Sequence, residues 1–504
     1  MGATTHPHQP RPSGVTEGWA TAGWLAVVCL AVTCATAAPQ LAWLIAAGLA
    51  WVAVGIAAES ALAIAVFLVL VVRPSLDAFS GRTLGTGAFY VNPAVVVGAG
   101  VALAAVRLAI SRGRRGLPVW PSSRLRTAHV WLAGAYVVAA LSGALLYGGA
   151  GLSLGLRELT RLSGVVGAFL LVAWWVTDDP RRVTRGWTFV AFGVVPPVAT
   201  ACWQLATGTG YSETEGLNRL QGTFAHPNTL ALFLTPLCVV AVAAALLNSA
   251  GRRFWLGLSV AIAILVALTS SRTGLLCLVI GSALVPFLGL WHSGGRELRR
   301  ALATLALMLG AAWLAVGGAV RLRFGNLSTA ALASQAIENA SPENSLEWRV
   351  VNWTTLVRMG LQHPWLGHGA GMTEVLNPIV NQNTGIPFNA HDDFVRFFFE
   401  AGVIGLACYC LYGVWLTVWL VGRLRQPRVE ARPVVAGVAA TFVAMFFLTA
   451  GTPELSLQTA VQYLLYGLIA LSLPTLPREA PHGPAQGAAH DRSTSLQGQK
   501  DASS

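Results

Sequence analysis

The sequence predicts an all-α, polytopic membrane protein, and its composition and the lengths of its apolar blocks carry that prediction. Hydrophobic residues make up 55% of the 504 residues and charged residues only 11%, against roughly 25% charged residues in soluble domains. The apolar residues come in blocks of about 15–20, the length that a helix needs to cross the hydrocarbon core. Backbone amides inside such blocks must be satisfied internally, which favours helices.

These blocks predict about 12–14 transmembrane helices. Their positions are roughly 19–37, 40–57, 59–72, 93–111, 128–147, 162–177, 187–206, 228–247, 254–270, 273–291, 301–319, 392–421, 433–451 and 457–473. The second and third blocks are short and poorly separated, so the count depends on them. The predicted organisation is a disordered cytoplasmic tail (1–18), transmembrane helices (19–319), one large external loop (320–391) between the eleventh and twelfth spans, C-terminal transmembrane helices (392–474) and a second disordered cytoplasmic tail (475–504).

The distribution of arginine predicts the orientation. Alternate loops carry clusters of arginine, at 112–126, 181–185, 252–253, 296–300 and 423–432, whereas the short loops between them carry few. By the positive-inside rule the clusters and both termini are cytoplasmic, and the large loop is external. The net charge of +12 is therefore spread between apolar blocks and not gathered on one soluble face, so we expect no nucleic-acid partner.

The large loop is predicted to contain an amphipathic helix. Apolar residues recur there at helical spacing, at Leu346, Val350, Trp353, Val357 and Leu361. Such a stripe is typical of a helix that lies at a membrane surface. The run WLGHGAG, at 365–371, then predicts a glycine-rich turn.

Polar residues gather in three patches that this orientation places on the external side. The first patch is NRLQGTFAHPN, with Arg219, His226 and Asn228; the second is TSSRTG, with Arg272; the third is NAHDDFVRFFFEAGVIG, with His391, Asp392, Asp393, Arg396 and Glu400. An arginine fork can make two charge-assisted hydrogen bonds to a diphosphate. Arg272 lies between two apolar blocks, where a charge is costly unless it faces a polar cavity. The alternative is that it snorkels to the interface.

The third patch begins a strongly apolar helix. The imidazole of His391 could take a proton from a hydroxyl as a general base, or it could simply hydrogen-bond the loop at the helix start. Asp392 and Asp393 suit the first turn of a helix through capping and the helix dipole. Arg396 is spaced to neutralise these two carboxylates and Glu400 within the helix.

Together these patches resemble the O-antigen ligases and O-antigen polymerases of bacterial envelopes. His391, a polar residue, nine positions and then Gly402 and Gly405 resemble the ligase signature, although Asp392 stands where that pattern prefers Asn, Ser or Gln. RLQGTFAHPNTLALFL resembles the external Arg-x-x-Gly segment of the family, and SSRTG resembles its second essential arginine. WRVVNWTTLVRMGLQHPWLGHGAG resembles the start of the family's large external loop. The similarity covers roughly residues 200–415.

The resemblance implies metal-independent, inverting glycosyl transfer at the external face of a bacterial inner membrane, without a cofactor. The donor would be a polyprenyl-diphosphate-linked glycan and the acceptor a glycan or a lipid-anchored molecule, in contact with membrane lipids. Arg219 and Arg272 would bind the diphosphate, and His391 would be the general base. The supporting residues would be Asp392, Asp393, Arg396, Glu400, His226 and Asn228. We expect no metal site.

Two alternatives stay open on the sequence. A ligase and a polymerase differ in acceptor, and the sequence does not separate them. The competing class is a transporter or flippase of a lipid-linked glycan, which would also have about a dozen spans. Transporters usually show internal repeats and polar residues at the midplane, whereas the polar residues here cluster on the external side.

The orientation can be tested by cysteine labelling in a background that lacks the native cysteines. An impermeant thiol reagent added from outside should label a cysteine in place of Ala340 and should not label one in place of Gly116, because the arginine clusters hold 112–126 in the cytoplasm. Labelling at position 116 alone would reverse the orientation and move the site to the cytoplasmic side.

Overall fold

The computed structural model of the chain describes residues 62–76, 93–209, 212–214, 217–247, 251–290, 347–380, 387–425, 431–448 and 455–473, with single helical residues between 295 and 310. Both predicted tails, the spans predicted at 19–37 and 40–57, most of the span at 301–319 and the first part of the large loop lie outside these residues.

The described chain is almost entirely helical. The helices are α3 (Leu62–Phe67), η2 (Leu68–Val72), α4 (Arg73–Ser75), α5 (Pro93–Arg114), α6 (Ser123–Asp178), α7 (Arg182–Thr207), α8 (Pro227–Leu247), α9 (Arg252–Leu268), α10 (Arg272–Leu290), α13 (Glu347–Gly360), α14 (Thr373–Leu376), α15 (Asp393–Leu424), α16 (Arg432–Val443), η5 (Ala444–Leu448) and α17 (Thr459–Leu471). Six of those described are long and apolar enough to cross a membrane. The predicted fold class, an all-α polytopic membrane protein, is confirmed. The segment between the spans predicted at 187–206 and 228–247 also contains a small antiparallel hairpin of β1 (Ser212–Thr214) and β2 (Leu217–Arg219).

Helix α6 is a helical hairpin that turns at Gly148. Its 56 residues include one residue outside helical geometry, Gly148, with φ 56° and ψ −131°. A Cβ on Gly151 would lie 1.9 Å from the carbonyl oxygen of Gly143, and one on Gly155 would lie 2.8 Å from the Cβ of Ala140. In one straight helix, positions 140 and 155 would be about 22 Å apart, so the two arms are antiparallel. The spans predicted at 128–147 and 162–177 are these arms, but residues 149–161, which were not predicted to be part of a span, are helical too.

Helix α15 is broken at Gly402, and the loop at 363–370 satisfies the break. Gly402 has φ 62° and ψ −165°, a conformation that is accessible to glycine and strained for other residues. The carbonyls of Phe399 and Glu400 accept from the backbone amides of His368 and Gly369, each at 2.8 Å. The amides of Val403 and Ile404 donate to the carbonyls of Pro364 and Trp365, at 2.8 and 3.3 Å. The break frees backbone amides and carbonyls of α15, and an apolar surrounding offers them no water. The loop at 363–370 supplies their hydrogen-bond partners instead.

Contacts between helix ends show that α8, α15 and α17 run in the same direction. At their starts, Thr229 of α8 donates to Gln458, just before α17, at 2.8 Å, and Ser456 donates to Asp393 of α15 at 3.0 Å. At the far end, Arg423 of α15 donates to the carbonyl of Ser472 after α17, at 2.8 Å. The first and third polar patches therefore lie at one end of the bundle.

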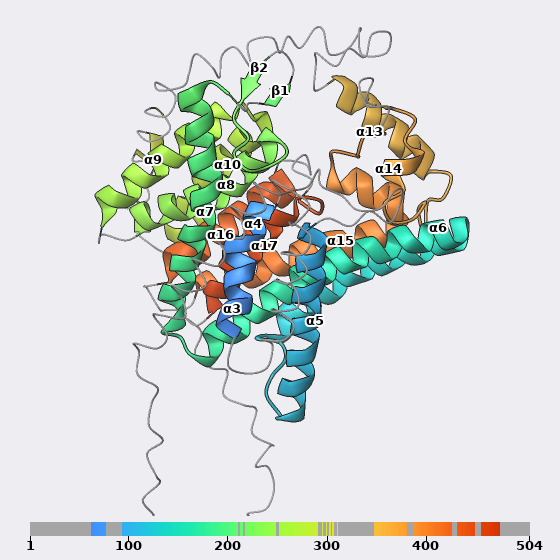
Figure 1. Cartoon of the computed structure of the whole chain (residues 1–504), viewed down its shortest axis with the longest axis horizontal. Helices are drawn as coiled ribbons and strands as arrows, with labels where there is room; N and C mark the ends of the chain where they lie inside the picture. Colours follow the sequence, from blue (N-terminus) through green and yellow to red (C-terminus); the bar gives the residue numbers. More distant parts are fainter. Residues whose placement is uncertain are drawn as a thin grey trace, which may run out of the picture.

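The helix predicted in the large loop is α13, and its apolar stripe faces away from the rest of the described chain. Val350, Val357 and Leu361 are 43%, 38% and 61% exposed, whereas Asn352 and Leu356 are buried. That this stripe lies on a membrane surface stays a prediction. In Figure 1, α13 and α14 lie over the tip of α6, on the opposite side of the view from α8, α9 and α10.

The break in α15 predicts a strong effect of Gly402→Ala. An added Cβ would lie 2.3 Å from the carbonyl carbon of Trp365, and the backbone conformation alone costs about 1–3 kcal/mol in an L residue. The variant should denature at a clearly lower temperature than the wild type in detergent. Gly422→Ala in the same helix is the matched control, since nothing lies within 4 Å of its Cβ position. Equal losses in the two variants would contradict this account of the break.

Candidate functional site

The first two polar patches meet at Arg219. This residue ends β2 and is only 2% exposed. Its Nε donates to the carbonyl of Thr269 at 3.0 Å, and its Nη2 donates to Oδ1 of Asn228 at 2.9 Å. Thr269 is the C-cap of α9, three positions before Arg272. The arginine of the first patch is thus bonded to the turn that carries the arginine of the second.

Arg272 begins α10 directly after a tight turn. Ser270 in that turn has a φ of 52°, and the Oγ of Ser271 caps α10 by accepting from the amide of Gly274 at 3.1 Å. Arg272 itself is half-buried. The turn therefore places a second guanidinium at the end of the bundle where Arg219 lies.

The remaining members of the first patch lie at the start of α8. His226 is exposed, and its Nδ1 accepts from the backbone amide of Asn228 at 3.1 Å. The Oδ1 of Asn228 accepts from Arg219, as described above. Asn228 therefore holds Arg219, whereas His226 makes its described contact with the helix start and not with the arginine.

His391 stands directly before α15, in a left-handed conformation with φ 51°. His391 and Ser270 are the non-glycine residues with positive φ in the part of the chain that the structure describes. Such strain persists where the surrounding structure enforces it, and it concentrates at functional sites. The imidazole is half-buried, and Asp392 behind it is the N-cap of α15, accepting from the amide of Val395 at 2.9 Å.

Asp393 and Arg396 are held by Ser456. The carboxylate of Asp393 accepts from the amide of Ser456 at 3.0 Å, from its hydroxyl, and from Tyr409 Oη at 2.8 Å. The Oγ of Ser456 in turn accepts from Nη1 of Arg396 at 2.8 Å. The helical spacing predicted that Arg396 neutralises Asp392 and Asp393. Asp392 caps the helix, and Asp393 interacts with Arg396 electrostatically and through the shared Ser456 hydroxyl.

Arg396 links two buried glutamates. Its Nε lies 3.2 Å from Glu400 Oε2, as the helical spacing predicts, and its Nη2 lies 2.9 Å from Glu158 Oε2. Glu158 comes from the second arm of α6 and also accepts from Arg161. Buried charges are tolerated when they are paired and fully hydrogen-bonded, and this cluster pairs them across α6 and α15.

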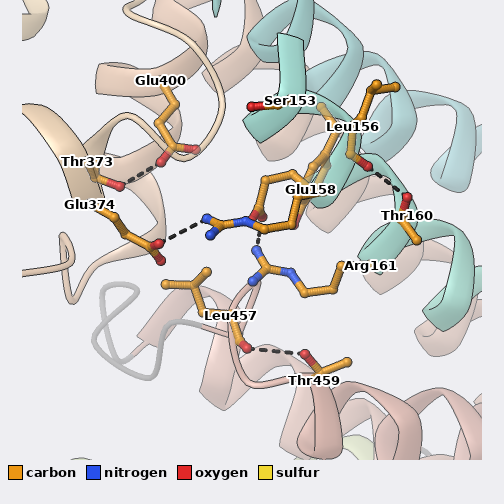
Figure 2. A network of polar contacts seen from close by, with 12 residues as sticks. Ser153, Leu156, Glu158, Thr160, Arg161, Thr373, Glu374, Glu400, Leu457 and Thr459 are labelled. Atoms are coloured by element: carbon orange, nitrogen blue, oxygen red, sulfur yellow. Dashed lines mark hydrogen bonds and ion pairs between the residues drawn. The ribbon is translucent and has the colours of Figure 1, made fainter. Parts of the chain in front are cut away.

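The same cluster reaches the large loop (Figure 2). Glu400 accepts from Thr373 Oγ1 at 2.6 Å, and Glu374 accepts from Nη2 of Arg157 at 2.9 Å. Thr373 and Glu374 form the first turn of α14. Sequence reasoning did not select Glu158, Thr373 or Glu374. The available signal was the charged run RELTR at 157–161, inside an otherwise apolar stretch.

The segment 455–458 connects the third patch to the first. Ser456 holds Asp393 and Arg396, and two residues later Gln458 accepts from Thr229, the neighbour of Asn228. This segment was also missed, because a short polar stretch before a span has no distinctive pattern. The predicted site residues thus lie at one end of the bundle, where contacts through Asn228 and the segment 455–458 connect the first patch, His226 included, with the third.

His368 holds the loop against α13 and the tip of α6. Its Nε2 lies 3.0 Å from the carbonyl of Met359, and its Nδ1 lies 3.1 Å from Tyr147 Oη at the tip of α6. Burial lowers the pKa of His368 below its ordinary value, although the bond to the Met359 carbonyl partly opposes the shift. A neutral ring that donates through Nε2 and accepts through Nδ1 satisfies both partners.

A comparison with protein families bears on this site. The family model described as O-antigen ligase matches residues 237–410, a stretch that includes Arg272 and His391. No curated protein matches the chain. The match confirms the resemblance that the motifs carry: residues 237–410 are similar to the O-antigen ligase family.

Proposed function

We propose that this protein transfers a glycan from a polyprenyl diphosphate to a hydroxyl of an acceptor, with inversion, at the external face of a bacterial inner membrane. The observation that carries the proposal is the placement of a half-buried histidine and two arginines at one end of the bundle, within or beside a matched O-antigen ligase domain. The opposite end carries the arginine clusters at 112–126 and 181–185, and this excess of positive charge supports a cytoplasmic location for that end.

Arg219 and Arg272 suit the diphosphate of the donor. Guanidinium groups stay charged and can bond two phosphate oxygens at once. Arg219 is fixed by Thr269 and Asn228, so its charge is set in place before the donor arrives. Preorganised cations stabilise the negative charge that develops on the leaving diphosphate.

His391 suits the acceptor. Its neutral imidazole takes the proton of the acceptor hydroxyl while that oxygen attacks the anomeric carbon. The bond from the anomeric carbon to the diphosphate oxygen breaks, and the diphosphate leaves with the electron pair. The proton on His391 is then lost to solvent. This direct displacement inverts the anomeric centre and requires neither a metal nor a cofactor. The acceptor is a lipid-anchored molecule in a ligase and a growing glycan in a polymerase.

The diphosphate role predicts the effect of changing the arginines. Arg272→Lys keeps the charge but loses the fork, so turnover with a purified lipid-diphosphate glycan should fall severely, and Arg219→Ala should lose donor binding. Arg253→Lys, an exposed arginine at the start of α9, is the matched control and should be unaffected. Near-normal activity of a folded Arg272→Ala protein would remove the diphosphate role.

The base role predicts that His391→Ala keeps donor binding and loses turnover by about 10²–10⁴-fold. The wild-type rate should also fall at acid pH, because a protonated imidazole cannot accept a proton. Asp392→Asn retains a capping side chain and should remain active. The comparison distinguishes the role of His391 as the base from the role of Asp392 as the helix cap.

The assay uses purified protein, a lipid-diphosphate glycan, candidate acceptors and a chelator. Equal product from wild type and His391→Ala would make the histidine structural, and product formed only with added metal would refute the metal-free mechanism. If the wild type moves the lipid between leaflets but forms no glycosidic bond with any acceptor, the protein is a transporter or flippase.

A further inference from the structure

We infer that Asn352 and Asn377, in the large loop, are positioning residues that hold the backbone of His391 in its left-handed conformation. The inference rests on the proposed function of His391 as the base. On this inference, the described part of the large loop contributes to the reaction by positioning His391, and the two asparagines need no contact with the substrate.

The side-chain amides of Asn352 and Asn377, called here the asparagine relay, donate hydrogen bonds to three successive backbone carbonyls directly before His391. Nδ2 of Asn352 donates to the carbonyl of Asn389 at 2.9 Å and to that of Ala390 at 3.4 Å. Nδ2 of Asn377 donates to the carbonyl of Phe388 at 2.7 Å. The chain entering His391 is therefore held at every peptide from 388 to 390, and Trp353 adds a bond from Nε1 to the carbonyl of Ala390 at 2.8 Å.

The two asparagines also hold each other. Nδ2 of Asn377 donates to Oδ1 of Asn352 at 2.7 Å, and Oδ1 of Asn377 accepts from the amide of Ile379 at 3.1 Å. Asn352 is 0% exposed and Asn377 is 2% exposed. An amide offers donors and an acceptor in one plane, so this relay needs asparagine and would not work with a carboxylate or an apolar side chain.

His391 is consequently fixed from both sides. Upstream the relay holds residues 388–390, and downstream Asp392 caps α15 through the amide of Val395. A positive φ at a non-glycine residue relaxes unless its surroundings enforce it. The relay supplies that constraint on the upstream side, and its two asparagines belong to α13 and to the residue that directly follows α14.

The test compares Asn352→Leu and Asn377→Leu, which preserve approximate shape but remove the donors, with Thr354→Val in the same helix. Thr354 is exposed and bonds only the carbonyl of Val350 in its own helix, at 2.7 Å, among the described contacts, so this control should be unaffected. Each asparagine variant should lower kcat by about 10²-fold, because a misplacement of about 1 Å can cost that factor. The donor KM should be nearly unchanged.

The decisive measurement repeats Asn352→Leu in the His391→Ala background. If the relay acts through His391, the double variant should turn over no more slowly than His391→Ala alone. A further loss of about 10²-fold in the double variant, or a wild-type kcat in both single variants, would overturn the inference. Failure of the proposed function would appear differently, as full activity in His391→Ala alone.

Discussion

Arg396 is a cation buried between helices, and the contacts that neutralise it hold the site together. It reaches Glu400 in its own helix, Glu158 in α6 and Ser456 before α17. A cation in such a place is very costly without partners, so these three elements must come together for the fold to form. The requirement brings the start of α15, and therefore His391, to a defined position beside the start of α17, from which Gln458 reaches the first patch.

The large loop is part of this arrangement and not an appendage to it. Its glycine-rich turn supplies the hydrogen bonds that α15 loses at Gly402, its α14 residues bond Glu400 and Arg157, and its asparagines hold the chain before His391. The first glycine of the ligase-like signature thus has a physical reason: the helix breaks there so that the loop can dock against it.

Much of the fold followed from the sequence because apolar blocks of spanning length determine helices locally. The common end of Arg219, Arg272 and His391 followed as well, since successive spans alternate in direction. The features that the sequence does not predict depend on contacts between residues far apart in the chain. Nothing in RELTR shows that Glu158 meets a residue 238 positions later, and the hairpin of α6 depends on close contact between Gly143 and Gly151. The face of α13 that packs on the protein could not be predicted either, because hydrophobic periodicity does not reveal that Asn352 is buried through its hydrogen bonds.

The hairpin of α6 also bears on the order in which the protein is made. Its two arms are adjacent in the chain, so they can enter the bilayer as a pair, carrying Glu158 and Arg161 together. The ribosome reaches Arg396 much later. Arg157 and Arg161, in the same arm as Glu158, lie within ion-pair distance of its carboxylate, so the glutamate has cationic neighbours of its own before the partner that completes the site is made.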